Sequence, residues 1–378
     1  MKSPTICFIG TYDREYTSNK LLLEGLRQNH IDVIEVNNEI KLTKMNEQKD
    51  ITWFHLARRV FRKYRVFAVI AKHWKDLQRA DYLYVGFPGH FDMLYVYFLG
   101  KILHKKIVFN PIVVFYTGYT EEQALLKKTS LKARILKWGE TIIYHMADLV
   151  LADTPNQREF LINTFKLKES KVVTLPLGAD DSLYSYTRLE NTSQKLNVTY
   201  YGLYSLLHGV QHIIEAARIL KDDNNIIFHM VGKGQTFQSN FERAQHLNLT
   251  NIHFHHNVPE KDHPGLLQKA DVFLGFLEEH PSIYKVIGNK IYQGLALGKV
   301  VITADSPLVR SYFENGVHMM LTPAAQPQEL ARMLVDLQKN PTKRIQIAEA
   351  GHRLFITKFT PRAIAKELLH ILNCHAYV

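Results

Sequence analysis

Short apolar runs alternate with segments of helical apolar spacing along most of the chain. In the first half, six runs end at turn-forming residues and predict buried strands. They are Ile6–Gly10, Asp32–Val36, Tyr82–Gly86, Lys106–Phe109, Asp148–Ala152 and Val172–Leu175. Between the first two, Leu21, Leu22 and Leu26 recur at helical spacing behind Ser18, which predicts a serine-capped helix ending at Gln28. This alternation is typical of a parallel sheet wound with helices.

The alternation begins again after a polar stretch. Residues 189–197 are rich in Asn, Thr, Ser and Gln and predict a linker. Six further apolar runs follow it: Val198–Gly202, Ile226–Gly232, Ile252–His255, Asp271–Phe276, Lys299–Thr303 and His318–Leu321. We therefore predict an α/β fold of two doubly wound, Rossmann-like domains, residues 1–185 and 186–360. A helix in the C-terminal segment 361–378 is expected to pack back onto the first domain.

The edge of each predicted sheet where its strands end is the expected ligand-binding edge. Open parallel sheets bind ligands beyond the carboxyl ends of their strands. With two such sheets in one chain, we expect the two edges to face one another across a cleft that holds the site.

The composition indicates which kinds of partner this chain can bind. The formal net charge is +11 and the pI is about 9.3, which favours an anionic partner: nucleic acid, acidic lipid or a phosphorylated small molecule. The basic residues are scattered and form no nucleic-acid-binding module, so we discount nucleic acid. Cys7 and Cys374 predict neither a disulfide framework nor a thiolate metal site. With no signal peptide or apolar run long enough to span a bilayer, the expected location is cytoplasmic.

Two segments of the second half carry the pattern of an anion site. Gly232 and Gly234 close a strand, and glycines there let backbone amides approach a phosphate; an ordinary tight turn is the alternative. Further on, Asn289 is expected to cap a short helix that ends at Gly298. The amides and dipole at the start of such a helix favour a diphosphate.

Three segments give the chain a family resemblance. Residues 287–303 (IGNKIYQGLALGKVVIT) resemble the donor-binding signature of family 4 glycosyltransferases of the GT-B fold. The run from Tyr200-Tyr201-Gly202 through His208-Gly209-Val210 to Ile213–Ala217 resembles the opening of their second domain, and Leu177–Asp180 resembles the junction between domains. The resemblance covers nearly the whole chain and is more specific in the second domain.

The resemblance implies a retaining transferase with no bound cofactor, in which a nucleotide-diphosphate sugar is the donor. The acceptor implied is a glycan, a lipid-linked or another membrane-proximal molecule. The donor-binding positions that it implies here are Gly202, His208, Gly232, Gly234, Asn289, Lys290 and Gln293.

The chain departs from the family pattern at four of its positions. Many members carry two glutamates where this sequence has Lys285 and Gln293, and an arginine and a lysine where it has Leu203 and His208. The Gln293 amide can still bond ribose hydroxyls, while Lys285 and Lys290 are candidates for the missing positive charge in catalysis.

Candidate residues of the first domain follow its predicted strands. His90 and Asp92, in the run Gly86–Asp92, are candidates to contact the acceptor or the transferred sugar; a turn histidine and a helix cap are the alternatives. Gly10 ends the first strand, and its turn can admit a sugar or phosphate.

The segment Trp53–Lys75 predicts a basic amphipathic helix. Its apolar stripe would contain Trp53, Ala57, Val60, Tyr64, Phe67 and Ala71, with Arg58, Arg59, Arg62 and Arg65 opposite. Such a helix suits peripheral binding to the anionic inner face of a membrane. Packing of the same stripe on the first sheet is the alternative.

Two other functions remain open, and no metal is expected. A nucleotide-sugar epimerase of similar fold would need acid and base groups such as His90 and Asp92, and a non-catalytic nucleotide-sugar-binding scaffold would fit Lys285 and Gln293. The histidine-rich stretch 246–263 lacks the carboxylate or cysteine that would complete a zinc site, so we expect a metal-independent enzyme.

Overall fold

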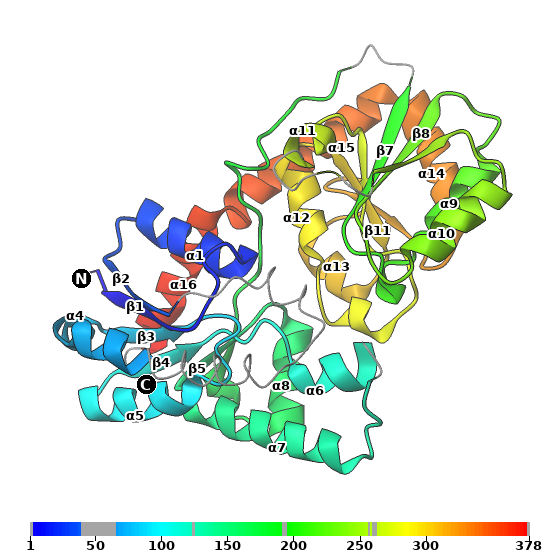
Figure 1. Cartoon of the computed structure of the whole chain (residues 1–378). Coiled ribbons are helices and arrows are strands. Elements are labelled where there is room, and N and C mark those ends of the chain that lie inside the picture. Colours follow the sequence, from blue (N-terminus) through cyan, green and yellow to red (C-terminus); the bar gives the residue numbers. More distant parts are fainter. Residues whose placement is uncertain are drawn as a thin grey trace. The chain divides into compact units, whose positions relative to one another are not determined.

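The chain divides into two units. The computed structural model describes residues 3–38, 66–122, 125–190, 195–255, 258 and 263–375. Unit 1 comprises Met1–Pro176 and Pro361–Val378, and unit 2 comprises Leu177–Thr360 (Figure 1). The division precedes the predicted boundary at 185/186, because Ala179 and Tyr184 are buried in a core cluster of unit 2.

Unit 1 contains a six-stranded parallel sheet of order β2-β1-β3-β4-β5-β6. Its strands are β1 (Ile6–Gly10), β2 (Val33–Asn37), β3 (Tyr82–Val85), β4 (Lys106–Phe109), β5 (Leu149–Ala152) and β6 (Val172–Thr174). The strand order reverses direction between β1 and β3, which makes that pair the switch point of the sheet.

Helices cover both faces of this sheet. Helices α1 (Thr17–Gln28) and α16 (Pro361–His375) pack on the face that carries Ile6 and Phe8. Helices α4 (Trp74–Arg79), α5 (Met93–Leu103), α7 (Leu131–Met146) and α8 (Pro155–Phe165) pack on the face that carries Cys7 and Ile9. The short elements are α6 (Phe115–Thr117), η1 (Gly118–Glu122) and η2 (Glu169–Lys171). Successive residues of a strand point to opposite faces, which explains why these strands read as continuous apolar runs.

The C-terminal helix belongs to unit 1. Helix α16 packs along α1, where a Cβ on Gly25 would lie 1.9 Å from the carbonyl oxygen of Pro361. The Tyr82 hydroxyl donates a hydrogen bond of 3.2 Å to the carbonyl of Leu372. At the start of α1 the predicted serine cap is wrong: Tyr16 holds the cap position, no side chain caps the helix, and Ser18 already lies inside it.

Unit 2 contains a second six-stranded parallel sheet, of order β12-β11-β10-β7-β8-β9. Its strands are β7 (Leu196–Tyr201), β8 (Ile226–Val231), β9 (Ile252–His255), β10 (Val272–Leu274), β11 (Val300–Ala304) and β12 (Met320–Thr322). The order reverses between β7 and β10. All twelve predicted strands are therefore present, each within two residues of its predicted bounds.

The helices of unit 2 also form two layers. One face of the sheet is covered by α9 (Val210–Ile219), α10 (Phe237–His246) and α14 (Pro327–Lys339). The other face is covered by α11 (His263–Leu267), α12 (Asn289–Ala296), α13 (Pro307–Tyr312) and α15 (Pro341–Lys358). Two 3₁₀ turns, η3 (Leu206–His208) and η5 (Pro281–Tyr284), lie in the loops after β7 and β10. Among the described helices of both units, none has the length and hydropathy needed to cross a bilayer.

Candidate functional site

Helix α12 (Asn289–Ala296) begins one residue earlier than the predicted cap at Asn289 requires. Gly288 holds the cap position with extended backbone, and no side chain bonds the free amides of the first turn. Asn289 is already helical, whereas a capping side chain needs non-helical backbone, so the predicted Asn289 cap is wrong. The helix ends as predicted before Gly298, whose φ is +70°.

Lys290 places a buried amine at the first turn of α12. The residue is 6% exposed, and its Nζ lies 4.2 Å from the centroid of the Tyr200 ring and 5.4 Å from that of Phe276. Burial lowers the pKa of Lys290 to about 7. Among the described residues, no carboxylate forms an ion pair with it. A buried amine without a carboxylate partner is a natural binding point for an anion.

His208 lies beside Lys290 but does not add a second positive charge. Its Nδ1 is 3.4 Å from Lys290 Nζ and 2.7 Å from the Tyr200 hydroxyl, and its ring stacks on Phe276 at 4.9 Å. Burial, together with the charge of Lys290, lowers the pKa of His208 to about 3. The imidazole is therefore neutral near pH 7. The side chain of Leu203 is 64% exposed and carries no charge. Neither of the two positions where the family commonly has cations therefore supplies a positive charge here.

Gly202 allows the backbone to approach this amine closely, and two further glycines let the neighbouring loops pack against each other. Gly202, Gly232 and Gly234 have φ values of +140°, +130° and +154°, which L side chains rarely adopt. A Cβ on Gly202 would lie 3.2 Å from Lys290 Nζ, and one on Gly232 would lie 2.0 Å from the carbonyl oxygen of Gly202. The loops that follow β7 and β8 are thus in direct backbone contact next to Lys290.

The cluster lies at the switch point of the second sheet. Gly202 follows β7 and Phe276 follows β10, and these two strands are neighbours at the point where the strand order reverses. Ligands of doubly wound sheets bind at this point. The structure therefore brings together Gly202, His208, Gly232 and Lys290, as the sequence predicted for a single site.

The other donor-side candidates surround this cluster less closely. Gln293, one turn along α12 from Lys290, is 9% exposed and donates a 3.0 Å hydrogen bond to the Tyr184 hydroxyl. Asn289 is exposed, and Lys285 is half-buried in the loop between η5 and α12. A Cβ on Gly234 would meet the amide of Tyr204 at 2.6 Å, so this loop also packs backbone against backbone.

In unit 1, Asp92 and Gly10 meet at the switch point between β1 and β3. Asp92 Oδ2 accepts a 2.7 Å hydrogen bond from the Thr11 amide, and a Cβ on Gly10 would lie 2.9 Å from the same oxygen. Asp92 stands at the cap position of α5, but its side chain bonds none of the helix amides. Its carboxylate therefore holds the end of β1.

His90 is enclosed in the core of unit 1. It is 1% exposed, and its ring packs against Phe115 at 4.1 Å and Phe109 at 5.2 Å. Its Nε2 lies 3.6 Å from Oε1 of Glu140, and burial lowers the pKa of His90 to about 4. Burial likewise raises the pKa of Glu140 to about 7, although two backbone amides bond that carboxyl. The structure thus places His90 beneath the surface, with neighbours different from those of Asp92.

Two polar residues at the same sheet edge were not among the candidates. Asp153 directly follows β5, and burial raises its pKa to about 7. Asn110 directly follows β4; its Nδ2 donates a 2.7 Å hydrogen bond to the Tyr84 hydroxyl, while its buried Oδ1 has no hydrogen-bond partner. Their position immediately after predicted strands is the sequence signal that could have identified them.

The predicted amphipathic helix is described only in part. Residues 53–65 lie outside the described residues, while 66–72 are helical. In that part Val66 and Ile70 face the core, and Phe67 and Ala71, which belong to the predicted apolar stripe, are exposed. Among the described residues of both units, no group of three histidine, cysteine or acidic side chains is arranged to hold a metal ion.

Comparison with known proteins identifies proteins that are similar to this chain. Residues 188–354 match the family model described as "Glycosyl transferases group 1". Mannosylfructose-phosphate synthase of Agrobacterium fabrum is 23% identical over 254 residues, covering 62% of this chain and 54% of that protein. Chitobiosyldiphosphodolichol beta-mannosyltransferase of Debaryomyces hansenii is 21% identical over 309 residues, covering 72% and 64%. This chain thus spans between about half and two thirds of these relatives.

Two solved structures match this chain over nearly its full length and over nearly their own full length. Sucrose-phosphate synthase from Thermosynechococcus elongatus superposes with a TM-score of 0.69 at 14% identity, covering 99% of each chain. Anabaena HepE in complex with UDP superposes with a TM-score of 0.65 at 14% identity, covering 99% of this chain and 100% of that one. Residues 188–354 are thus similar to the group 1 glycosyltransferases, and the chain as a whole has the two-domain GT-B fold.

Proposed function

We propose that this protein is a retaining glycosyltransferase that moves a sugar from a nucleotide-diphosphate donor to a glycan, a lipid-linked or another membrane-proximal acceptor. The observation that carries the proposal is the buried Lys290 amine beside Gly202 and Gly232 at the switch point of unit 2. The family match and the solved complexes of HepE with UDP and with UDP-glucose support a nucleotide sugar as donor.

The chemistry requires charge stabilisation at the leaving group. As the bond from the anomeric carbon to the diphosphate breaks, negative charge grows on the diphosphate. The acceptor hydroxyl oxygen bonds to the same carbon and gives up its proton, which the departing diphosphate can accept. Lys290 and the free amides of the first turn of α12 are placed to meet that charge. The transfer needs no bound cofactor, and Gln293 would orient the ribose.

The acceptor is proposed to bind at the strand ends of unit 1. Asp92 and Gly10 form one side of that edge, and the polar groups of Asn110 and Asp153 extend it across β4 and β5. A carboxylate and an unpartnered amide oxygen are suitable acceptors for the hydrogen bonds of sugar hydroxyls. His90, which is enclosed, would act by positioning this loop. A cytoplasmic, membrane-peripheral location fits a membrane-proximal acceptor.

The proposal is tested by measuring nucleotide release with and without acceptor. Thermal shift with a panel of nucleotide sugars first identifies the donor, because a ligand that binds only the folded state raises its apparent stability. A transferase then releases nucleotide in proportion to added acceptor. Conversion of the donor sugar without acceptor would indicate an epimerase, although the 1% exposure of His90 disfavours the acid–base role that reaction needs. Donor binding without either reaction would indicate a scaffold.

Donor binding should weaken as the pH rises through about 7. Burial sets the pKa of Lys290 at about 7 in the free protein, and a bound diphosphate raises it because the charge favours the protonated amine. Nucleoside diphosphate affinity should therefore be constant below that pKa and fall by up to about tenfold per pH unit above it. Titration calorimetry between about pH 6 and 9 measures this. Lys290→Gln is the control, since its weaker affinity should lack the step; a flat wild-type profile would contradict the assignment.

Transfer should proceed without a divalent ion. In this proposal the charge on the diphosphate is met by a lysine and by backbone amides instead of a bridging metal. Turnover in excess EDTA should equal turnover in untreated buffer. Loss of activity in EDTA that magnesium or manganese restores would show that the leaving group depends on a metal.

A further inference from the structure

Helix α5 of unit 1 exposes an apolar stripe. Leu94, Phe98 and Ile102 are 47%, 63% and 65% exposed and are spaced four residues apart, so they share one face of the helix. The opposite face carries Met93, Val96 and Leu99, which are buried against the sheet. The exposed apolar stripe is thus not needed for packing α5 against the sheet.

Helix α7 lies beside α5 and exposes a second stripe (Figure 1). Leu131, Ile135 and Trp138 are 71%, 58% and 67% exposed. A groove of about 380 Å³ between the two helices is lined by Tyr97 and Trp138 among others. Six large apolar side chains exposed on two neighbouring helices mark an interaction surface, because soluble proteins seldom leave such groups together in water.

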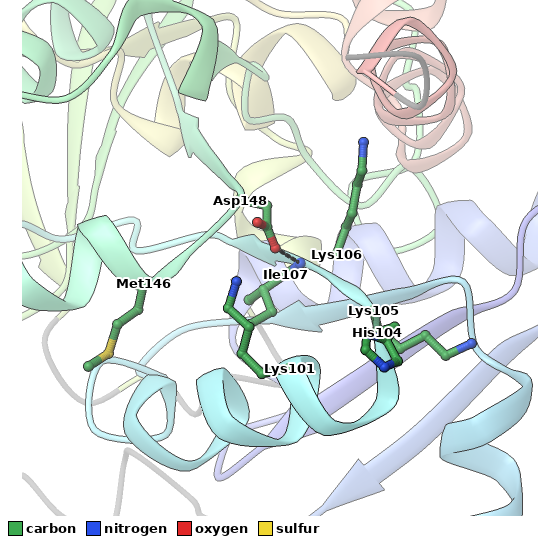
Figure 2. A pocket seen from close by; sticks show the side chains of 8 residues that line it. Lys101, His104, Lys105, Lys106, Ile107, Met146 and Asp148 are labelled. Atoms are coloured by element: carbon green, nitrogen blue, oxygen red, sulfur yellow. Dashed lines mark hydrogen bonds between the residues drawn. The ribbon is translucent and has the colours of Figure 1, made fainter.

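A basic pocket adjoins this groove at the end of the helices. Its volume is about 180 Å³, and it is lined by Lys101, His104, Lys105 and Lys106 (Figure 2). Met146 lines both the groove and the pocket, so the two lie next to one another. Lys106 and Asp148 also line a larger pocket of about 480 Å³, to which Lys166, Lys168 and Lys171 contribute.

The positive charge of this surface is not neutralised within the described residues. No acidic residue occurs in the sequence from Met93 to Ile107 or from Leu125 to Gly139. Neither Lys101 nor Lys105 pairs with a carboxylate of the described residues. The one carboxylate that lines the pocket, Asp148, accepts a 2.7 Å hydrogen bond from the Ile107 amide (Figure 2). Lys106 Nζ donates a 2.8 Å hydrogen bond to the carbonyl of His375, and Lys101 Nζ lies 5.5 Å from the centroid of the Tyr97 ring, so these contacts leave the positive charge of both lysines in place. Positive charge without a paired carboxylate favours an anionic occupant.

The combination of apolar stripes and lysines indicates which kind of partner can bind this surface. A second copy of this chain in a two-fold interface would bring together two positively charged surfaces whose segments 93–107 and 125–139 contain no acidic residue to pair with the lysines. Nucleic acid would satisfy the lysines and leave the aliphatic stripes in water. An anionic bilayer satisfies both, because aromatic and aliphatic side chains enter its interface while lysines bind its phosphates.

We propose that helices α5 and α7 form a docking surface for an anionic phospholipid bilayer, in which the apolar stripes enter the interface and the lysine pocket receives lipid phosphate groups. The surface is distinct from the predicted helix 53–75, although Phe67 at its described end lies 6.1 Å, ring to ring, from Tyr95 of α5. The proposal does not depend on the proposed function, because membrane binding is measured without donor or acceptor.

Vesicle co-sedimentation of the full chain tests the surface. Wild type should bind vesicles of phosphatidylcholine mixed equally with phosphatidylglycerol, and should bind pure phosphatidylcholine far more weakly. Lys101→Gln with Lys105→Gln should weaken binding to the anionic vesicles about tenfold or more, since each lysine near such a surface contributes on the order of 1 kcal/mol. Phe98→Gln with Trp138→Gln should weaken it at least as much.

Tryptophan fluorescence reports insertion directly. The emission of wild type should shift to the blue on anionic vesicles as Trp138 leaves water, and Trp138→Gln should remove that shift. Ile356→Gln and Lys339→Gln, at exposed positions of unit 2, are matched controls that should bind like wild type. Lys105 is half-buried and the other substituted side chains are exposed, so the unfolding temperatures should agree.

Three outcomes would overturn the proposal. The first is vesicle binding that all the α5 and α7 variants retain in full, which would place the contact elsewhere. The second is release of the wild type from vesicles by inorganic phosphate at low concentration, which would make the pocket a site for a free anion. The third is that the wild type is a dimer, that Phe98→Gln with Trp138→Gln converts it to a monomer, and that neither the wild type nor this double variant binds vesicles.

Discussion

Lys290→Ala should lower turnover about a hundredfold or more with the best donor. The amine is buried, and the neighbouring His208 is neutral and cannot replace its charge. A positioned charge at a leaving group typically contributes a few kcal/mol to the transition state, which corresponds to that loss. Steady-state kinetics should show the defect in kcat, since the charge on the diphosphate is greatest in the transition state.

A matched control is available in the same unit. Lys299 is also buried, with its pKa lowered to about 8, but it precedes β11 at the opposite edge of the sheet. Lys299→Ala should reduce stability and leave turnover of the folded protein nearly unchanged. If Lys290→Ala keeps near-normal turnover while Lys285→Ala does not, the charge is supplied by Lys285. If neither lysine matters, backbone amides alone hold the diphosphate.

Gly232→Ala should abolish most donor binding while leaving the rest of unit 2 folded. The new Cβ would lie 2.0 Å from the carbonyl oxygen of Gly202, and φ at this residue is +130°. Backbone strain of this kind costs about 1–3 kcal/mol, and the loop after β7 must move away from Lys290 to relieve the contact. We expect nucleoside diphosphate affinity to fall by about tenfold to a hundredfold in calorimetric titration.

Gly265→Ala serves as the comparison for this substitution. Gly265 is an exposed residue of α11, and a Cβ there would meet nothing within 4 Å. Alanine also favours a helix over glycine by about 1 kcal/mol, so this variant should bind donor normally and be no less stable. Normal binding by Gly232→Ala would show that the loops after β7 and β8 do not form the site.

The strands were predictable because each is buried on both faces. In a parallel sheet covered by helices, a strand such as β5 (Leu149–Ala152) reads as an unbroken apolar run bounded by polar residues. Helix caps were less predictable. Whether Ser18 or Asn289 caps a helix depends on the backbone angles of one residue, and both proved to be helical themselves.

Site residues could be predicted from the sequence where they lie close together in one short motif. Lys290 and the glycines belong to short motifs, and their chemistry can be read from adjacent residues. Tyr200 and Phe276 were missed because they reach Lys290 from two strands that become neighbours only through the order β10-β7. Tertiary packing likewise decided the environment of His90. Its sequence position predicted a strand-end loop, but the rings of Phe109 and Phe115 enclose it.

The return of the chain to unit 1 imposes an order on folding during synthesis. Ile364, Leu368 and Leu372 of α16 are buried in the same core cluster as Ile6 and Phe8 of β1. The ribosome makes every residue of unit 2 before it makes α16. Unit 2 can therefore complete its core on the nascent chain, whereas the face of the first sheet beside α1 stays uncovered until α16 leaves the exit tunnel. During that interval, the first half of this protein is the part in need of chaperone protection.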